Sequence, residues 1–307
     1  MKKIELLGLQ TVPEIQPGDN LAEIIFKAAV DEIGGLRDRD VVVITSKIVS
    51  KAEGRLRKVD EVVPGKRALA IAGKTGKDPR WVQMILDEEH EILAIIALKG
   101  IIAEHVFGAS ADSPAARQLL TRKPALCITR DSRGRIHTCE AGIDSSNHPA
   151  GTVSLLPGEP DEAARDIRQQ LQGLCGKEVA VILADTEIIP FGTMDLALGS
   201  SGISPLAREF GQKDRYERPK FGGMDLVANE LASASALLFG QGPAGIPVAV
   251  VRGYSYQISE SENIANTLPT QAGRRKVAEA IRETIRATAC ARPFRQRLLL
   301  KIASWFI

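Results

Sequence analysis

Three short, uninterrupted runs of apolar and mostly β-branched residues constrain the fold of this chain more than any other feature. They are Val41–Thr45 (VVVIT), Val179–Leu183 and Pro247–Val251. Continuous apolar runs of this length are typical of buried strands. The segments between them have apolar positions at helical spacing, as in residues 160–174. This alternation of helices and strands predicts a mixed α/β (α+β) fold.

Local signals place the remaining elements. We expect helices at residues 20–34, 64–90, 160–174, 226–238 and 270–289. The first of these ends at a glycine pair, and Pro79 restarts the second. Turn residues at 132–134, between apolar runs at 126–129 and 135–139, predict a hairpin. Residues 91–121 begin strongly apolar and continue into what resembles a capped helix start, and the pattern assigns them no single structure.

Composition excludes several classes of protein. The 307-residue chain has 40 lysines and arginines against 38 aspartates and glutamates, a net charge of +2, which gives no basic footprint for nucleic acid. The cysteines at 127, 139, 175 and 290 show neither metal-knuckle spacing nor a disulfide framework, so we expect reduced thiols in a cytosolic protein. No window approaches the apolar length of a membrane span, and Glu5 and Gln10 interrupt the N-terminal run, unlike a signal peptide.

Residues 142–147 (GIDSSN) place one carboxylate and one amide among small residues. In a turn, Asp144 and Asn147 would bond to their own backbone, which is the interpretation that local sequence favours. The alternative is that Asp144 is held out to a metal ion and Asn147 to a nucleotide phosphate.

Other segments also have a structural and a functional interpretation. Asp185–Thr186 follow a buried apolar strand. They either lie at a strand end, where open α/β sheets bind ligands, or cap a helix or turn. The glycine-rich loop 240–245 would wrap phosphates with backbone amides, or it joins a helix to a strand. Lys47 and Lys51 suit an anionic ligand, although a solvated turn is the default. Combined, two aspartates, two lysines and a glycine loop fit a magnesium site that also uses substrate phosphate oxygens.

Residues 68–75 (ALAIAGKT) miss a P-loop by one residue. Ala68 replaces the first glycine, whose turn lets backbone amides converge on phosphate, and the segment has a helical pattern. We therefore predict no P-loop there.

Within residues 4–255 the chain contains, in this order, VVVITSKIVSKAEGR, AGIDSSN, the ADT strand end, GQKDRY and LLFGQGPAGIPVAVVRG, and GDNLAE precedes them at 18–23. In these blocks and their order the chain resembles the coenzyme F420:γ-glutamyl ligase family. The resemblance implies a mixed α/β fold with mixed sheets and flanking helices. It also implies a cytoplasmic homodimer whose site lies near the dimer interface.

The resemblance carries specific roles to residues of this chain. It implies a divalent cation, Mg²⁺ or Mn²⁺, at Asp144, Asp185 and Thr186, and a further metal position at Gln241, where an amide is a weaker ligand than a carboxylate. The implied catalytic residues are Lys51, Asp144 and Asp185. The implied nucleotide contacts are Val12, Pro13, Glu14, Ile15, Ser46, Lys47, Lys51, Asn147, Phe239, Gly240, Gln241, Gly242, Pro243, Ala244, Gly245 and Ile246.

The chemistry implied by the resemblance is acyl activation. GTP, or ATP, converts the carboxylate of a small-molecule acceptor into an acyl phosphate, and the amine of an amino acid, glutamate in this family, displaces phosphate. Lys47 and Lys51 would add fixed positive charge, and much of the catalysis would be positioning.

The chain departs from the family pattern in three places. Residues 185–192 (DTEIIPFG) lack the family's arginines, and Glu187 adds a negative charge. An apparent insertion covers residues 92–121, and a basic, apolar tail covers residues 292–307. The tail is either a helix that packs in the core or a dimer, or a surface membrane anchor. We assign residues 1–255 to a catalytic domain and 256–307 to a helical extension.

Two hypotheses follow. In the first, the protein is an amide ligase, either an authentic coenzyme F420 ligase or one with another acceptor. The altered segment 187–192 favours another acceptor, because isoleucine offers an anion none of arginine's donors. In the second, the protein binds nucleotide without ligase turnover and acts by protein interaction through the insertion or the tail.

Overall fold

The computed structural model of the protein describes residues 3–97, 125–189, 192–240, 242, 245–267, 275–276 and 279–285. The chain divides into two units, residues 1–267 and 268–307. In the second unit, residues 275–276 and 279–285 are helical, as predicted for 270–289. The predictions for residues 98–121 and for the tail at 292–307 lie outside the described residues, and the boundary at residue 255 stays a prediction.

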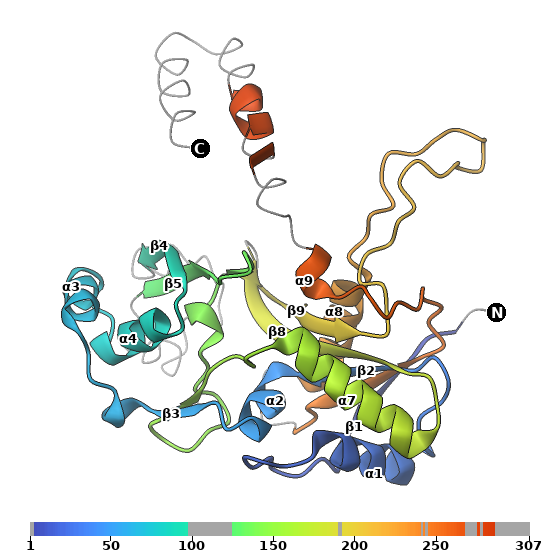
Figure 1. The fold of residues 1–307 in the computed structure, drawn as a ribbon, viewed down its shortest axis with the longest axis horizontal. Helices are drawn as coiled ribbons and strands as arrows, with labels where there is room; N and C mark the ends of the chain where they lie inside the picture. The colour runs from blue at the N-terminus through green and yellow to red at the C-terminus, as the bar shows by residue number, and fades with distance from the viewer. Residues whose placement is uncertain are drawn as a thin grey trace. The chain divides into compact units, whose positions relative to one another are not determined.

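A five-stranded mixed sheet forms the centre of the first unit (Figure 1). Its order is β1 (Glu5–Leu9), β10 (Val248–Arg252), β2 (Val41–Thr45), β8 (Ala180–Ile189) and β9 (Gly192–Ser201). β2 and β8 are parallel, and the other neighbours are antiparallel. The three apolar runs of the sequence are the three inner strands, which confirms that they are buried strands.

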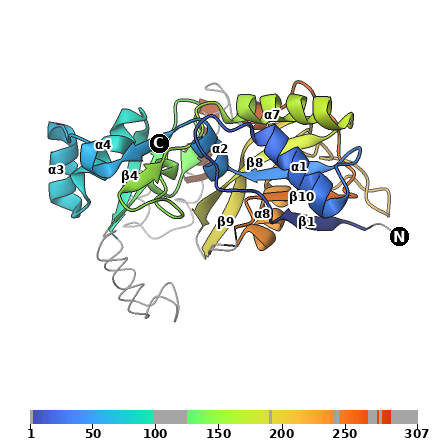
Figure 2. The same cartoon turned by 90° about the horizontal axis from the view of Figure 1, so that it is seen from below.

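Helices cover both faces of this sheet (Figure 2). α1 (Leu21–Ile33) and α7 (Pro160–Cys175) pack on one face, and α8 (Val227–Phe239) packs on the other. The helix predicted at 20–34 is confirmed, and residues 20 and 34 are its caps. The Asn20 side chain accepts hydrogen bonds from the first turn, and Gly34 takes the left-handed conformation (φ 70°) that ends the helix.

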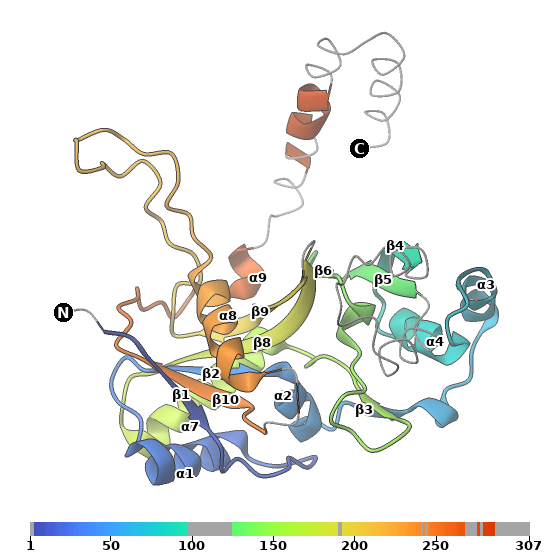
Figure 3. The ribbon, with the colours of Figure 1, turned by 180° about the vertical axis from the view of Figure 1, so that it is seen from behind.

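A smaller sheet lies at one end of the unit (Figure 3). Its strands are β4 (Glu91–Ala97), β5 (Ala125–Arg130) and β6 (Ile136–His137), so the predicted hairpin is confirmed. The helices α3 (Lys66–Thr75) and α4 (Pro79–Asp87) precede it in the chain. The segment 68–75 lies within α3, which confirms that it is not a P-loop.

Short elements connect the two sheets. They are α2 (Ser46–Ala52), the strand pair β3 (Leu56–Lys58) and β7 (Thr152–Ser154), and the 3₁₀ turns Val59–Glu61 and Glu140–Gly142. A short helix, α9 (Ile264–Thr267), follows β10. In the part of the chain that the structure describes, no helix is both long and apolar enough to cross a membrane.

Two local predictions were wrong. The strand predicted to end at residues 184–186 continues to Ile189, because β9 pairs with it from Val181 to Ile189. The lysines after β2 do not lie in a solvated turn, because residues 46–52 form α2, which packs Ile48 and Val49 into the core.

A buried ion pair joins β10 to the loop before β2. Arg252 Nη2 lies 2.8 Å from Asp40 Oδ2, Arg252 Nε donates to Asp40 Oδ1 at 3.0 Å, and Arg252 Nη2 also donates to the Gly35 carbonyl. The Asp40 side chain is 1% exposed. Removing one partner leaves the other charge buried without compensation.

We therefore expect Arg252→Ala to lower the free energy of unfolding by about 3–5 kcal/mol in urea denaturation. Arg208→Ala is the matched control, because Arg208 is 59% exposed in its pair with Glu262 and its removal should cost about 1 kcal/mol or less. Equal losses in the two variants would contradict the expectation.

Candidate functional site

A cavity of about 670 Å³ lies where β2 ends and β8 continues. β2 stops at Thr45, opposite Ala184, so the edge of β8 beyond Ala184 is not covered by β2. Asp185, Thr186 and Ile188 line the cavity along this edge. The volume is in the range of small-molecule sites, and the position agrees with the rule that open α/β sheets bind ligands beyond strand ends.

The predicted nucleotide residues that the structure describes all line this one cavity, although they come from four separate parts of the chain. They are Val12, Pro13, Glu14, Ile15, Ser46, Lys47, Lys51, Asn147, Phe239, Gly240, Gly242, Gly245 and Ile246. The three other predicted positions, Gln241, Pro243 and Ala244, lie outside the described residues. The structure thus brings together the residues that the sequence could only group by resemblance.

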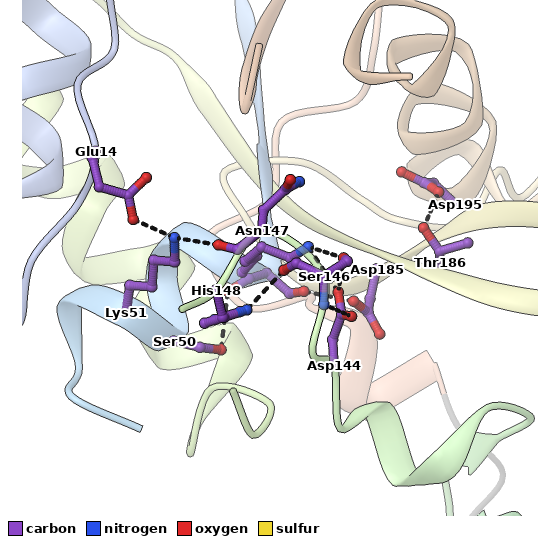
Figure 4. Close-up of polar contacts among 12 residues, drawn as sticks. Glu14, Ser50, Lys51, Asp144, Ser146, Asn147, His148, Asp185, Thr186 and Asp195 are labelled. Atoms are coloured by element: carbon purple, nitrogen blue, oxygen red, sulfur yellow. Dashed lines mark hydrogen bonds and ion pairs between the residues drawn. The ribbon is translucent and has the colours of Figure 1, made fainter. Parts of the chain in front are cut away.

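Lys51 is 5% exposed although it carries a charge. It projects from α2, and its Nζ donates to Glu14 Oε1 at 2.5 Å and to the Asn147 carbonyl at 3.0 Å (Figure 4). Glu14 is itself largely exposed, with 68% of its side chain open to solvent. Glu14 therefore occupies a position beside a buried ammonium group that an anionic ligand could take.

Asp144 is held by Lys47 and by its own turn. Lys47 Nζ lies 2.7 Å from Asp144 Oδ2, and the backbone N–H and hydroxyl of Ser146 both donate to the carboxylate. Burial acts to raise the pKa of Asp144, but the Lys47 and Ser146 hydrogen bonds outweigh it and hold the pKa below its ordinary value. The turn interpretation of residues 142–147 is confirmed for Asp144, because its carboxylate accepts hydrogen bonds from Ser146. The side chain also lines the cavity, and its role as a metal ligand stays a prediction.

A turn with left-handed backbone conformation, at residues 140–142, precedes Asp144 and sets where the chain enters the cavity. Glu140, Ala141 and Gly142 have φ values of 55°, 56° and 71°, and a Cβ on Gly142 would lie 2.4 Å from Leu156 Cγ. A positive φ costs free energy in a non-glycine residue, so contacts with the surrounding structure must stabilise this turn. The ion pair between the buried Glu140 carboxylate and Lys77, at 2.6 Å, is such a contact.

Asp185 faces the same cavity from β8. The Ser46 hydroxyl donates to its Oδ1 at 2.6 Å. Burial raises the pKa of Asp185 to about 7; the Ser46 bond opposes this shift, and the charges of Glu187 and Asp144 add to it. Figure 4 shows Asp144 and Asp185 near one another, so a cation between them would relieve a repulsion already present.

Two carboxylates suit some metal ions better than others. In the described ranges, no group of three or more His, Cys, Asp or Glu side chains is placed to hold a metal ion. Magnesium is bound in proteins through one or two carboxylates together with phosphate oxygens of the substrate. Asp144 and Asp185 therefore fit a cation that binds together with a nucleotide.

Thr186 and Asp185 leave β8 on opposite faces, because side chains alternate along a strand. Thr186 lies directly opposite Asp195 of β9 and donates its hydroxyl to Asp195 Oδ1 at 2.7 Å. Burial raises the pKa of Asp195, and the Thr186 hydrogen bond opposes it. Asp195 was not among the residues predicted from the sequence. Its only local signal is an acidic residue in an otherwise small and apolar stretch, and its place in the cavity depends on the register of β8 and β9.

Glu187, the added negative charge of segment 185–192, bonds to His137 of β6 and to Thr138, which follows it. Its Oε2 accepts from the backbone N–H and the hydroxyl of Thr138, and its Oε1 lies 3.2 Å from His137 Nδ1. His137 also faces Asp131 at 3.5 Å and stacks on His90. This cluster joins the small sheet to the β8–β9 pair beside the cavity.

Comparisons with known proteins identify relatives over most of the chain. Residues 10–253 match the family model described as F420-0:Gamma-glutamyl ligase. The chain is 35% identical to the Coenzyme F420:L-glutamate ligase of Methanosarcina acetivorans over 268 residues, 85% of this chain and 92% of that protein. It is 36% identical to the protein of the same name from Methanothermobacter thermautotrophicus over 255 residues, 82% of this chain and 90% of that protein.

The His137 cluster predicts a pH dependence of stability. Burial lowers the pKa of His137, but Asp131 and Glu187 outweigh it and raise the pKa to about 9, while burial lowers the pKa of the stacked His90 to about 4. The folded pKa of His137 lies above the unfolded value of about 6.5. Its stabilising charge is therefore fully present below about pH 6.5 and is lost as the pH rises through about 9.

We expect wild-type protein to lose about 2 kcal/mol of unfolding free energy from this group between pH 7.5 and 9.5, and Glu187→Gln to lose much less over the same window. Asp185 is already ionised across most of this window, so its titration adds little. Urea denaturation at a series of pH values measures how the unfolding free energy changes with pH. Glu61→Gln, which alters an exposed carboxylate, is the control. A slope in Glu187→Gln as steep as in wild type would refute the role of the cluster.

Proposed function

The chain belongs to the F420-0:Gamma-glutamyl ligase family, and from this premise we propose that it is a nucleotide- and divalent-metal-dependent ligase that joins L-glutamate to a carboxylate acceptor. The observation that carries the proposal is the single cavity in which two carboxylates, two lysines and a glycine-containing loop meet. A cytoplasmic location follows the family expectation.

The residues at the α2 end of the cavity suit a nucleotide phosphate chain. Lys51 and Lys47 each bond a carboxylate in the structure, and phosphate oxygens would replace or share those contacts. Gly240, Gly242 and Gly245 line the same cavity, and a glycine backbone allows an anionic ligand to approach amide N–H groups closely. GTP is the nucleotide that the resemblance favours, with ATP as the alternative.

Asp144 and Asp185 are the proposed holders of Mg²⁺ or Mn²⁺. When bound, such a cation neutralises charge on the transferring phosphoryl group and aligns the attacking oxygen. The protein's own part is to keep both carboxylates in place, which the Ser46 and Ser146 hydrogen bonds do.

The proposed reaction has two steps. The acceptor carboxylate oxygen attacks the γ-phosphorus, the bond to the β,γ-bridging oxygen breaks, and an acyl phosphate and nucleoside diphosphate form. The glutamate nitrogen then attacks the acyl carbon and the acyl C–O bond breaks. Of the two protons that the ammonium group loses, one leaves with phosphate as hydrogen phosphate and the other is released to solvent. Fixed positive charge from Lys51 stabilises the anions that these steps develop.

We also propose that the protein acts as a homodimer, and residues 205–226, here called the arm, support this. The arm leaves the sheet between β9 and α8 and extends away from it (Figures 1 and 3). It exposes aromatic side chains, with Phe221 96% and Tyr216 78% exposed. A projecting segment with exposed aromatic residues is characteristic of an interaction surface, and a second copy of the chain is the proposed partner.

For the ligase, we expect phosphate release from GTP or ATP that requires Mg²⁺, glutamate and an acceptor, tested with a coenzyme F420 precursor and other carboxylates. Asp144→Ala should lower this rate roughly 100-fold or more and weaken Mn²⁺ binding measured by calorimetry, while leaving the thermal transition in place. Asp60→Ala, which removes an exposed carboxylate, is the control. Nucleotide binding without turnover for any acceptor would favour the binding-protein hypothesis instead.

For the dimer, we expect sedimentation to report two copies for wild type and a shift towards one copy for the double variant Tyr216→Ser, Phe221→Ser, because the exposed rings would no longer be buried between copies. Val63→Ser removes a side chain that is 85% exposed outside the arm and should change nothing. A wild-type monomer, or a dimer unaffected by the double variant, would rule out this role for the arm.

A further inference from the structure

Asp195 is a charged residue in the cavity that the proposed nucleotide and metal contacts do not use. It lies on β9 with 5% of its surface exposed, and it lines the cavity on the face of the sheet that α8 covers. Thr186 donates to its Oδ1, and the Ser233 hydroxyl of α8 donates to its backbone carbonyl at 2.7 Å. Its position is therefore fixed by both neighbouring elements.

The charge of this carboxylate is not balanced by the residues around it. Among the described residues, no lysine, arginine or histidine forms an ion pair with Asp195, and its side-chain hydrogen bond comes from a neutral hydroxyl. An uncompensated buried carboxylate costs free energy, whereas Thr186 would need only a neutral acceptor. Because burying this charge costs free energy and the carboxylate lines a binding cavity, its position indicates that a positively charged group of a ligand binds beside it.

The two positively charged groups of the proposed reaction are a divalent cation and the ammonium group of the amino acid. Asp144 and Asp185 lie together on the α2 side and fit the divalent cation. Asp195 lies on the α8 side, and Thr193, two residues earlier on the same face of β9, adds a hydroxyl. One carboxylate with nearby hydroxyl oxygens matches the three N–H donors of an ammonium group.

We propose that Asp195 binds the α-ammonium group of the incoming amino acid and so places its nitrogen in the cavity that the activated acceptor shares. The inference rests on the proposed ligase function and adds a subsite to it. The carboxylate favours ligands that carry an amine over those that carry a hydroxyl at the same carbon, since only the ammonium group pairs with its charge.

The test compares L-glutamate with (S)-2-hydroxyglutarate, which differs by the replacement of the ammonium group with a hydroxyl. Binding is measured by calorimetry with Mg²⁺ and a non-hydrolysable GTP analogue present. We expect wild type to prefer glutamate by roughly 10- to 100-fold, as for a charge-assisted hydrogen bond. Asp195→Asn should abolish most of this preference, although its amide oxygen can still accept the Thr186 hydrogen bond.

Two controls separate this role from others. Glu230→Gln removes an exposed carboxylate of α8 and should keep the full preference. Mn²⁺ binding to Asp195→Asn should equal that of wild type, and in turnover the variant should raise the KM for glutamate more than it lowers kcat.

Three results would overturn the inference: no glutamate binding to wild type, an unchanged preference in Asp195→Asn, or a loss of Mn²⁺ affinity in that variant in place of a loss of preference. Failure of the ligase function has a different signature. It would appear as an amine preference that depends on Asp195 in a protein that releases no phosphate with any acceptor.

Discussion

The parallel pairing of β2 with β8 is the constraint on which the site depends. Five residue pairs, from Val41 with Ala180 to Thr45 with Ala184, set the point at which β2 stops. β8 continues because β9 pairs with it, so the edge of β8 beyond Ala184 is not covered by β2. α2 begins at once after β2, which puts Ser46 and Lys47 beside that edge. A shift of this register by one residue would move Asp185 away from Ser46, because neighbouring residues of a strand face opposite sides of the sheet.

The second carboxylate reaches the cavity from a different part of the fold. Asp144 follows a left-handed turn between the small sheet and β7, and that turn is supported by the buried pair of Glu140 and Lys77. The Glu187 and His137 contacts join the small sheet to β8 on the same side. The distance between Asp144 and Asp185 thus depends on packing between two sheets, and not on either strand alone.

The charged groups that line the cavity fall into two classes, which differ in whether their partner carries the opposite charge. Lys47 bonds Asp144 and Lys51 bonds Glu14, so both ammonium groups have carboxylate partners. Asp185 and Asp195 have hydroxyl partners, and burial raises the pKa of both. Asp185 and Asp195 therefore favour positively charged ligand groups. At the two lysines, an anionic ligand could replace the carboxylate that each ammonium group now contacts. The cavity suits substrates that bring phosphate, a cation and an amine together.

The sequence by itself determined the mixed α/β class, the three inner strands, the capped helices and the family, because apolar runs, helix caps and motif order are local properties. It also supplied the residues of the cavity through the resemblance, and it left open whether residues 142–147 form a turn or a site. It was wrong about the end of β8 and about the segment after β2, since strand length depends on a partner strand and helix formation on packing.

Only the tertiary structure decided that Asp185 and Thr186 face opposite sides, that Asp195 joins the cavity, and that Glu187 bonds to His137. Those outcomes follow from register and from contacts between residues far apart in the chain, which no local pattern encodes.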